Sequence, residues 1–434
     1  MPPGHNDTIE IKPAGPVRAT VRVPGSKSHT NRSLVIAALS EGESRLEGAL
    51  FAADTRAMIE GLMALGFGVR TDEAGTITVE GRGGEIPARS ARINARDAGT
   101  VMRFLPAVAA LGEGEFTFDG SARMRERPVG DLVEGLRSLG VDAGANGPGG
   151  CPPVVVRASG LAGGTARVSA TTSSQFASAL LLAAPCAKSP VTVELEGEVV
   201  SRPFIELTLD LMKEFGAEVE SASPNELRVA APRPYRAGVH RIEGDATAAS
   251  YFWAAAAVTG GRVEVANVGT SSHQGDARFV DVLERMGCRV ERSEEAITVS
   301  GPEVLRGGEF DLNRMPDVAQ TLSVVALFAE SPVSMTNVAN LRVKECDRLS
   351  ALAAELPKLG AQVEERPDGI TVTPPESGRA GLHGGRIATY NDHRMAMSFA
   401  VAGLAILGVV IENPACVSKT YPRFFDDFAR LADK

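Results

Sequence analysis

The sequence contains few cysteines and lacks any segment that is long and apolar enough to span a membrane. The five cysteines are scattered without paired spacing, which indicates neither a disulfide framework nor a zinc site. No uncharged run of about 18 apolar residues occurs, so a transmembrane helix is not predicted. Residues 1–11 also lack the basic and then apolar pattern of a secretory signal. We therefore expect a cytoplasmic protein with reduced thiols.

The chain also lacks an excess of positive charge. Lys and Arg together number 45, against 54 Asp and Glu, for a net charge of −9. Nucleic acids are bound largely by neutralising phosphates, so this balance argues against a nucleic-acid partner. Small anions stay possible, because a local cationic site can coexist with an acidic surface. A length of 434 residues with 44% hydrophobic content predicts a soluble globular protein of two domains, with no membrane partner.

A pattern recurs through the sequence: an apolar residue and a glycine are followed by a short predicted strand, a polar turn and a second predicted strand. The copies start at Leu65, Leu139, Phe215, Met286 and Leu359, which are 74, 76, 71 and 73 residues apart. A period of about 73 residues predicts six units in a chain of 434.

Two sets of helices are predicted from the apolar spacing. The first set is amphipathic and ends at the repeated glycines; its members are Arg56–Leu65, Pro128–Leu139, Pro203–Phe215, Ala277–Met286, Arg348–Leu359 and Tyr421–Leu431. The second set is more apolar, as in buried helices; its members are Thr30–Leu39, Thr100–Leu111, Ser174–Ala184, Thr247–Val258, Asp317–Ala329 and His393–Leu407.

These elements predict six βαβαββ units in two groups of three. The last helix has no strand pair after it, so we expect Thr8–Lys12 and Ala19–Val23 to supply the strands that the sixth unit lacks. Domain I would then comprise residues 1–24 plus 244–434, and domain II residues 25–243. An active-site cleft is expected between the two domains.

Polar residues gather at the N-terminal ends of the second helix set. Free N–H groups and the helix dipole make such ends potential anion sites. Ser, Thr and Asp at these positions are also explained as N-caps. Lys27, Arg32 and Arg394 are not, because a cation in the first turn opposes the dipole. We therefore expect these three to meet an external anion.

Further basic residues stand near other turns at comparable repeat positions. They are Arg127, Lys344, Arg348 and Lys419. A single surface arginine is usually a solvated charge, but this concentration favours a shared pocket for polyanions.

Five segments resemble the signature segments of EPSP synthases. They are Pro24–Arg32 (PGSKSHTNR), Met124–Pro128 (MRERP), Ser173–Gln175 (SSQ), Arg342–Glu345 (RVKE) and Tyr390–Arg394 (YNDHR). The likeness runs in order over nearly the whole chain. It implies the two-domain inside-out α/β barrel of enolpyruvyl transferases, phosphoenolpyruvate and shikimate 3-phosphate as substrates, and no metal or organic cofactor. We also expect a monomer, although the sequence does not give the oligomeric state.

The resemblance also implies the site residues. The set for shikimate 3-phosphate is Lys27, Ser28, Arg32, Ser173, Ser174, Gln175, Ser201, Asp317, Asn340 and Lys344. The set for phosphoenolpyruvate is Lys27, Gly99, Arg127, Gln175, Arg348, Arg394 and Lys419. Arginine suits the two-pronged binding of carboxylate and phosphate, and a glycine lets the backbone approach an anion.

The implied reaction adds the 5-hydroxyl of shikimate 3-phosphate to C2 of phosphoenolpyruvate, protonates C3 and then expels phosphate. Asp317 is the candidate base, although a plain N-cap also explains an aspartate at a helix start. Glu345 and Lys27 are candidates for the C3 proton and the departing phosphate, and their order of action stays open.

Three positions depart from the family pattern. Arg96-Asp97 stands where relatives show Gly-Asn, Phe104 replaces a frequent proline, and Phe204 replaces a tyrosine. Arg96 and Asp97 either pair with each other or reshape the phosphoenolpyruvate pocket enough to weaken glyphosate, the inhibitor that competes with phosphoenolpyruvate.

Other readings are less consistent with the sequence. The sister enzyme that acts on UDP-N-acetylglucosamine expects a reactive loop cysteine, for which Cys151 is the candidate. A phosphate-binding module without catalysis would not need Asp317 and Glu345. The segment Gly25–Ser28 lacks the glycine spacing of a P-loop. A lone His393 favours a structural hydrogen-bonding role over a metal ligand.

Overall fold

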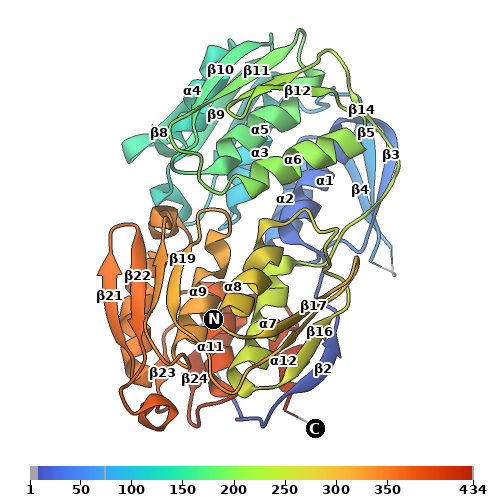
Figure 1. Cartoon of the computed structure of the whole chain (residues 1–434). Coiled ribbons are helices and arrows are strands. Elements are labelled where there is room, and N and C mark those ends of the chain that lie inside the picture. Colours follow the sequence, from blue (N-terminus) through green and yellow to red (C-terminus); the bar gives the residue numbers. More distant parts are fainter. Residues whose placement is uncertain (1–7, 73–74, 433–434) are drawn as a thin grey trace. The chain divides into compact units, whose positions relative to one another are not determined.

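The computed structural model describes residues 8–72 and 75–432, and the chain divides into two compact units (Figure 1). Unit 1 comprises Met1–Pro24 and Glu243–Lys434, and unit 2 comprises Gly25–Ile242. The second unit is thus inserted between two segments of the first. The border expected from the sequence placed Glu243 on the other side.

Unit 2 contains three sheets in the described part of the chain. In the first, β14 (Tyr235–Arg236) and β15 (Val239–Arg241) both pair with β3 (Ser40–Glu47), which is followed by β5 (Ile77–Arg82) and β4 (Gly68–Thr71). The second has the order β6 (Ser90–Asn94), β7 (Glu113–Asp119), β9 (Cys151–Ser159), β8 (Asp142–Gly147). The third has the order β10 (Gly164–Ser169), β11 (Val191–Glu196), β13 (Glu226–Val229), β12 (Val219–Ser223).

Unit 1 also has three sheets among its described residues. One has the order β17 (Arg289–Arg292), β18 (Ile297–Ser300), β16 (Arg262–Val265), β2 (Arg18–Val21). Another has the order β19 (Gly308–Asp311), β20 (Val333–Thr336), β22 (Gly369–Thr373), β21 (Gln362–Arg366). The last is shorter, with β1 (Thr8–Glu10), β24 (Val410–Glu412) and β23 (Arg386–Ile387).

The sheets share one pairing scheme, which explains the sequence repeat. In the second sheet of unit 2, for example, β6 and β7 are parallel, whereas β7–β9 and β8–β9 are antiparallel. A parallel pair requires a crossover and an antiparallel pair only a short turn. The crossover here is a buried helix, an amphipathic helix follows the second strand, and a hairpin closes the unit. The predicted βαβαββ order is confirmed.

The prediction for the two N-terminal strands was only half right. β1 pairs antiparallel with β24 and so extends the sheet of the sixth unit, as expected. β2 instead pairs parallel with β16, in a different sheet. The physical reason is the insertion: the crossover from β2 to β16 passes through all of unit 2 and one further helix, so β2 takes the place that β6 and β10 take in their sheets.

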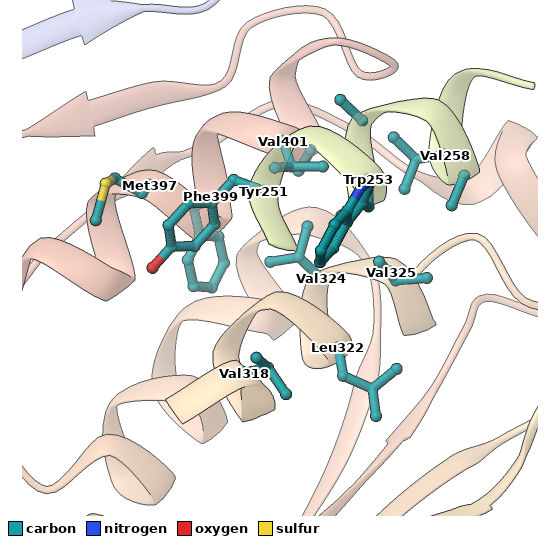
Figure 2. Packing of buried hydrophobic residues seen from close by; sticks show 14 of the residues in the cluster. Tyr251, Trp253, Val258, Val318, Leu322, Val324, Val325, Met397, Phe399 and Val401 are labelled. Carbon is teal, nitrogen blue, oxygen red and sulfur yellow. The ribbon is translucent and has the colours of Figure 1, made fainter. Parts of the chain in front are cut away.

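The apolar helices form the interior of each unit. In unit 2 these are α1 (Lys27–Leu39), α3 (Gly99–Ala109) and α5 (Ser174–Ala183); in unit 1 they are α7 (Ala246–Thr259), α9 (Ala319–Ala326) and α11 (His393–Gly403). Trp253 of α7, Val324 of α9 and Val401 of α11 lie together in the core of unit 1 (Figure 2). Figure 1 shows the strands of that unit on either side of these helices. The predicted Asp317–Ala329 helix is shorter, because a 3₁₀ turn, η5 (Pro316–Val318), precedes α9.

Hydroxyl groups fix how the inner helices of unit 1 align. Thr321 in the first turn of α9 lies 3.2 Å from the Ser250 hydroxyl of α7 and 3.3 Å from the Ser398 hydroxyl of α11. All three side chains are buried, where an unsatisfied hydroxyl would be costly. Their bonds therefore bring the N-terminal halves of the three helices side by side.

The six amphipathic helices end within two residues of the predicted end, apart from the one predicted as Arg348–Leu359, which ends at Glu355 and continues as a 3₁₀ turn, η7 (Leu356–Leu359). They are α2 (Ala53–Ala64), α4 (Gly130–Ser138), α6 (Pro203–Glu214), α8 (Phe279–Arg285), α10 (Arg348–Glu355) and α12 (Phe424–Ala429). The five repeated glycines all have positive φ, from 83° at Gly140 to 106° at Gly287. Only glycine adopts this conformation without strain, so the repeat in the sequence marks the left-handed ends of helices. Across the described residues, no helix is long and apolar enough to cross a membrane.

Candidate active site

Arg348 is the centre of a network of charged residues in unit 1. It is the first residue of α10, follows the N-cap Asp347, and is 1% exposed. Its Nε donates to Asp392 Oδ2 at 2.7 Å, its Nη1 to Asp317 Oδ1 at 3.1 Å and its Nη2 to Glu345 Oε2 at 3.0 Å. A cation at a helix start opposes the dipole, and three carboxylates offset that cost.

The network continues through the two acids that the sequence singled out. Asp317 uses its other oxygen, Oδ2, to accept a bond of 2.8 Å from Arg394 Nη2. Glu345 uses Oε1 to contact Lys419 Nζ at 3.1 Å. The order of contacts is therefore Lys419, Glu345, Arg348, Asp317, Arg394, and we call these five residues the ion-pair chain.

Both arginines of the ion-pair chain stay charged although they are buried. Burial alone would lower the pKa of Arg348, but the charges of Asp392, Glu345 and Asp317 outweigh it and raise that pKa above its usual value. Burial likewise opposes the charge of Arg394, and Asp317 raises the pKa of Arg394 above the usual value. The ion-pair chain is therefore a largely buried network in which three cations share the carboxylates of Asp317 and Glu345.

A turn with unusual backbone geometry places Asp392 and Arg394. Tyr390 and Asn391 have positive φ values of 52° and 56°. Asp392 then caps α11 by accepting from the Arg394 N–H at 2.9 Å, while it also holds Arg348. A non-glycine residue rarely adopts positive φ unless its surroundings impose it.

Glu355, the last residue of α10, holds this turn in place. It is 1% exposed and accepts from the Ala388 N–H at 2.9 Å, the Tyr390 hydroxyl at 2.8 Å and Lys358 Nζ at 2.7 Å. Glu355 therefore acts on the site through the turn, as a positioning residue.

Replacing Glu355 with alanine is expected to lower the free energy of unfolding by about 1–3 kcal/mol, since a buried amide and a hydroxyl lose their acceptor. Urea unfolding would measure the change. The matched control is Glu364→Ala, whose side chain is 71% exposed and should change stability little. Equal losses in the two variants would show that Glu355 does not hold the turn.

In unit 2, three predicted anion-binding residues lie together at the start of α3. A Cβ atom built on Gly99 would lie 3.0 Å from Arg127 Nη2 and 3.3 Å from Gln175 Oε1. Arg127 is 6% exposed, donates to the Asp97 carbonyl at 3.4 Å, and its Nε meets no acceptor among the residues that the structure describes. A buried cation with an unused donor next to a helix N-terminus suits an anion.

The inner helices of unit 2 start close to one another. Asn31 in the first turns of α1 donates to Thr100 Oγ1 of α3 at 2.7 Å. Ser173 caps α5 by accepting from the Gln175 N–H at 3.2 Å. Lys27, the first residue of α1, is paired with Asp54 Oδ2 of α2 at 3.3 Å. The starts of α1, α3 and α5 thus form a second group of polar residues, within unit 2.

Arg32 differs from the other predicted cations. It is 1% exposed, and its guanidinium donates to Thr208 Oγ1 at 2.7 Å, the Ser28 carbonyl at 3.0 Å and the Phe204 carbonyl at 3.0 Å. Burial lowers its pKa to about 9. Its contact with shikimate 3-phosphate stays a prediction. In this structure, the hydrogen bonds of Arg32 to Thr208 and Phe204 connect α1 to α6.

The remaining predicted residues are distributed between the two units. Ser174 and Ser201 are buried in unit 2, and Ser201 has a positive φ of 55°. Asn340 is 6% exposed in η6 (Ala339–Val343) of unit 1, and Lys344 directly follows that turn. His393 is buried at the start of α11, with its Nδ1 3.6 Å from Asp392 Oδ1, and its structural hydrogen-bonding role stays a prediction.

The departures from the family pattern have ordinary partners in the structure. Arg96 pairs with Glu60 Oε2 at 2.7 Å, and Asp97 accepts a hydrogen bond from Ser121. Each residue therefore has a partner other than the one that the sequence suggested. Phe104 and Phe204 both lie near Arg32, whose guanidinium carbon is 5.3 Å and 5.9 Å from their ring centres.

Sequence reasoning missed three carboxylates: Asp54, Asp392 and Glu355. Asp392 lies within the YNDHR segment, so its place between Arg348 and Arg394 had a signal in the sequence. Asp54 and Glu355 sit in amphipathic helices, where an acid is ordinarily a solvated residue, and their contacts depend on the tertiary structure.

Comparison with known proteins identifies the family of this chain. A family model described as EPSP synthase (3-phosphoshikimate 1-carboxyvinyltransferase) matches residues 11–428. The chain is 44% identical over 430 residues to the 3-phosphoshikimate 1-carboxyvinyltransferase of Nostoc punctiforme, covering 99% of this chain and 100% of the relative. It is 46% identical over 436 residues to the enzyme of that name from Ralstonia nicotianae, covering 98% and 99%.

Solved structures give the same result. The EPSP synthase from Acinetobacter baumannii has a TM-score of 0.82 and 26% identity, with 98% of each chain covered. The enolpyruvyl transferase NikO from Streptomyces tendae shares the fold, with a TM-score of 0.72 at 19% identity over 97% of this chain and 96% of that one. This chain therefore belongs to the EPSP synthase (3-phosphoshikimate 1-carboxyvinyltransferase) family of enzymes.

Proposed function

We propose that this enzyme transfers the enolpyruvyl group of phosphoenolpyruvate to the 5-hydroxyl of shikimate 3-phosphate, releasing phosphate, in the shikimate pathway of aromatic amino-acid biosynthesis. The ion-pair chain is the observation that carries the proposal. It combines three cations suited to a phosphorylated carboxylate with two acids that can exchange protons.

Asp317 serves as the base for the 5-hydroxyl in this proposal. Its two oxygens are each held by one arginine, Oδ1 by Arg348 and Oδ2 by Arg394. A carboxylate offers about four acceptor sites, so these two bonds orient it and leave room for the substrate hydroxyl. The hydroxyl proton passes to Asp317 as the oxygen attacks C2.

Glu345 is the candidate for delivering the proton to C3. Its two oxygens contact Arg348 and Lys419, and both cations favour its charged form. An anion bound to the same cations would offset their charge and let Glu345 take up a proton. Glu345 can therefore act as an acid only when the anionic substrate is bound. Lys27 is the other candidate for delivering this proton.

Gly99, Arg127 and Gln175 of unit 2 contribute to phosphoenolpyruvate binding in this proposal. The support is their proximity and the unused Nε of the buried Arg127. Ser28, Ser173, Ser174, Ser201, Asn340 and Lys344 remain the proposed contacts of shikimate 3-phosphate.

A Gly99→Ala variant is expected to raise KM for phosphoenolpyruvate by about tenfold, within the range that overpacking by one methyl group costs. The added Cβ would lie 3.0 Å from Arg127 Nη2, the group proposed to hold the anion. Steady-state kinetics would measure the change. Gly15→Ala is the matched control, because a Cβ there meets nothing within 4 Å.

The rival reading, transfer to UDP-N-acetylglucosamine, rested on Cys151 as a reactive loop thiol. Cys151 is instead the first residue of β9 and 7% exposed. Burial raises the pKa of its thiol, which disfavours the nucleophilic thiolate. The structure therefore speaks against that role.

The direct test mixes the purified chain with phosphoenolpyruvate and shikimate 3-phosphate and measures phosphate release. UDP-N-acetylglucosamine in place of shikimate 3-phosphate is the control acceptor. Phosphate release with shikimate 3-phosphate but not with UDP-N-acetylglucosamine as the acceptor supports the proposal. Phosphate release only with UDP-N-acetylglucosamine as the acceptor overturns it. We further propose that the enzyme is cytoplasmic and monomeric. Gel filtration would check the monomeric state.

A separate proposal from the sequence is that Arg96 and Asp97 reshape the phosphoenolpyruvate pocket and so weaken inhibition by glyphosate. The ion pair of Arg96 with Glu60 gives that arginine a partner on α2, which weakens the idea that it reshapes the phosphoenolpyruvate pocket. A titration that shows inhibition unaffected by Arg96→Gly would end the idea.

A further inference from the structure

Asp276 is a buried acid that the proposed reaction does not use. It lies in η4 (Gly275–Arg278) and is 3% exposed. Its Oδ2 accepts a hydrogen bond from the Thr247 hydroxyl of α7, while its Oδ1 has no hydrogen-bond partner among the described residues. A buried carboxyl with an unsatisfied oxygen is costly, so its retention calls for an explanation.

The charges that act on Asp276 belong largely to the candidate active site. They come from Asp317 of η5, Arg394 of α11 and Asp245 at the N-cap of α7. Tyr251 of α7 also interacts with Arg394. Burial and the charge of Asp317 raise the pKa of Asp276 to about 7, although Arg394 and the Thr247 bond act in the other direction.

Arg394 is the link between Asp276 and Asp317. It forms a direct ion pair with Asp317 at 2.8 Å, and the charge of Asp276 also acts on it electrostatically. While Asp276 is protonated, Asp317 is the carboxylate that forms the direct ion pair with Arg394. When Asp276 loses its proton, a second negative charge is added on the Arg394 side of the ion-pair chain, where the anionic substrate is proposed to bind.

We propose that Asp276 is a positioning residue of the active site whose proton keeps Arg394 available to Asp317 and to the phosphoenolpyruvate anion. The inference rests on the proposed function, because it uses phosphoenolpyruvate as the ligand of Arg394. It adds a residue outside the ion-pair chain that controls how strongly that chain attracts an anion. Binding of the anion favours the protonated acid, so proton uptake accompanies binding.

The sign of the pH dependence follows from this linkage. Below the pKa of Asp276 the acid is neutral and phosphoenolpyruvate binds well; as pH rises through about 7 the acid ionises and repels the anion. KM for phosphoenolpyruvate should therefore rise between pH 6.5 and 8.5. A shift of one pKa unit on binding would give a rise of roughly fivefold beyond that due to the substrate's own ionisation.

The experiment measures KM for phosphoenolpyruvate against pH in the intact enzyme and in Asp276→Asn, with saturating shikimate 3-phosphate. The asparagine cannot ionise, so the additional rise should disappear. Asp281→Asn is the matched control, since Asp281 is an exposed acid of α8 that pairs with Arg292. It should retain the pH dependence of the original enzyme.

A second variant keeps the inference testable if Asp276→Asn does not fold. Thr247→Val removes the hydroxyl that favours ionised Asp276, so the rise in KM should move to higher pH. Turnover with an identical KM profile in the original enzyme and in both variants would overturn the inference. Failure of the original enzyme to release phosphate at any pH would instead overturn the proposed function.

Discussion

Replacing Asp317 with asparagine is expected to lower kcat by about 10²- to 10⁴-fold, the usual contribution of general acid–base catalysis. Asparagine has nearly the same shape as aspartate but cannot take the proton of the 5-hydroxyl. Its single amide oxygen can accept a hydrogen bond from only one of Arg348 and Arg394, and its NH2 group faces the other, so one of the two present bonds is lost. Steady-state phosphate release would give kcat, and calorimetry the binding of shikimate 3-phosphate.

The control for this variant is Asp426→Asn, an exposed acid on α12 of the same unit, which should leave kcat unchanged. Asp317→Asn should bind shikimate 3-phosphate nearly as well as the original enzyme. A variant that turns over normally would remove Asp317 from the base role and revive the interpretation as a plain helix-start residue.

Arg348→Met is expected to lower the free energy of unfolding by about 3–5 kcal/mol, the cost of removing one partner from a buried ion pair. Methionine fills much of the space but leaves Asp392, Asp317 and Glu345 without their shared cation. Asp392 is the most affected, since its side chain is completely buried. Urea unfolding followed by circular dichroism would measure the loss.

The matched change is Arg386→Met, which breaks the ion pair with Glu412 in the same unit. Arg386 is 64% exposed, and exposed pairs contribute about 0–1 kcal/mol. If both variants lose the same stability, then the three carboxylates do not depend on Arg348, and the ion-pair chain is not the buried network described above.

Much of the fold could be predicted because its local signals are strong. A glycine with positive φ ends each of five amphipathic helices, and no other residue adopts that conformation as easily. Apolar helices and short strands then recur at a constant period. The pairing of β2 could not be predicted, because its parallel partner β16 lies beyond the whole of unit 2.

Several residues of the ion-pair chain could be predicted from the sequence, but the contacts between them could not. Lys and Arg at helix starts indicate an anion site, and Arg348, Arg394 and Lys419 do lie on one ion-pair chain. Which acid faces which cation depends on tertiary contacts, and so does the difference between Arg32 and Arg127. Both are buried, but only Arg127 keeps a donor that meets no acceptor in the described part of the chain.

The most direct measurement is a crystal structure of Asp317→Asn with phosphoenolpyruvate and shikimate 3-phosphate bound, since slow turnover should let both substrates persist. We predict that the phosphate and carboxylate of phosphoenolpyruvate lie within hydrogen-bond distance of Arg348, Arg394 and Lys419. Phosphoenolpyruvate bound elsewhere, with all three cations still occupied by Glu345, Asp392 and residue 317, would contradict the account.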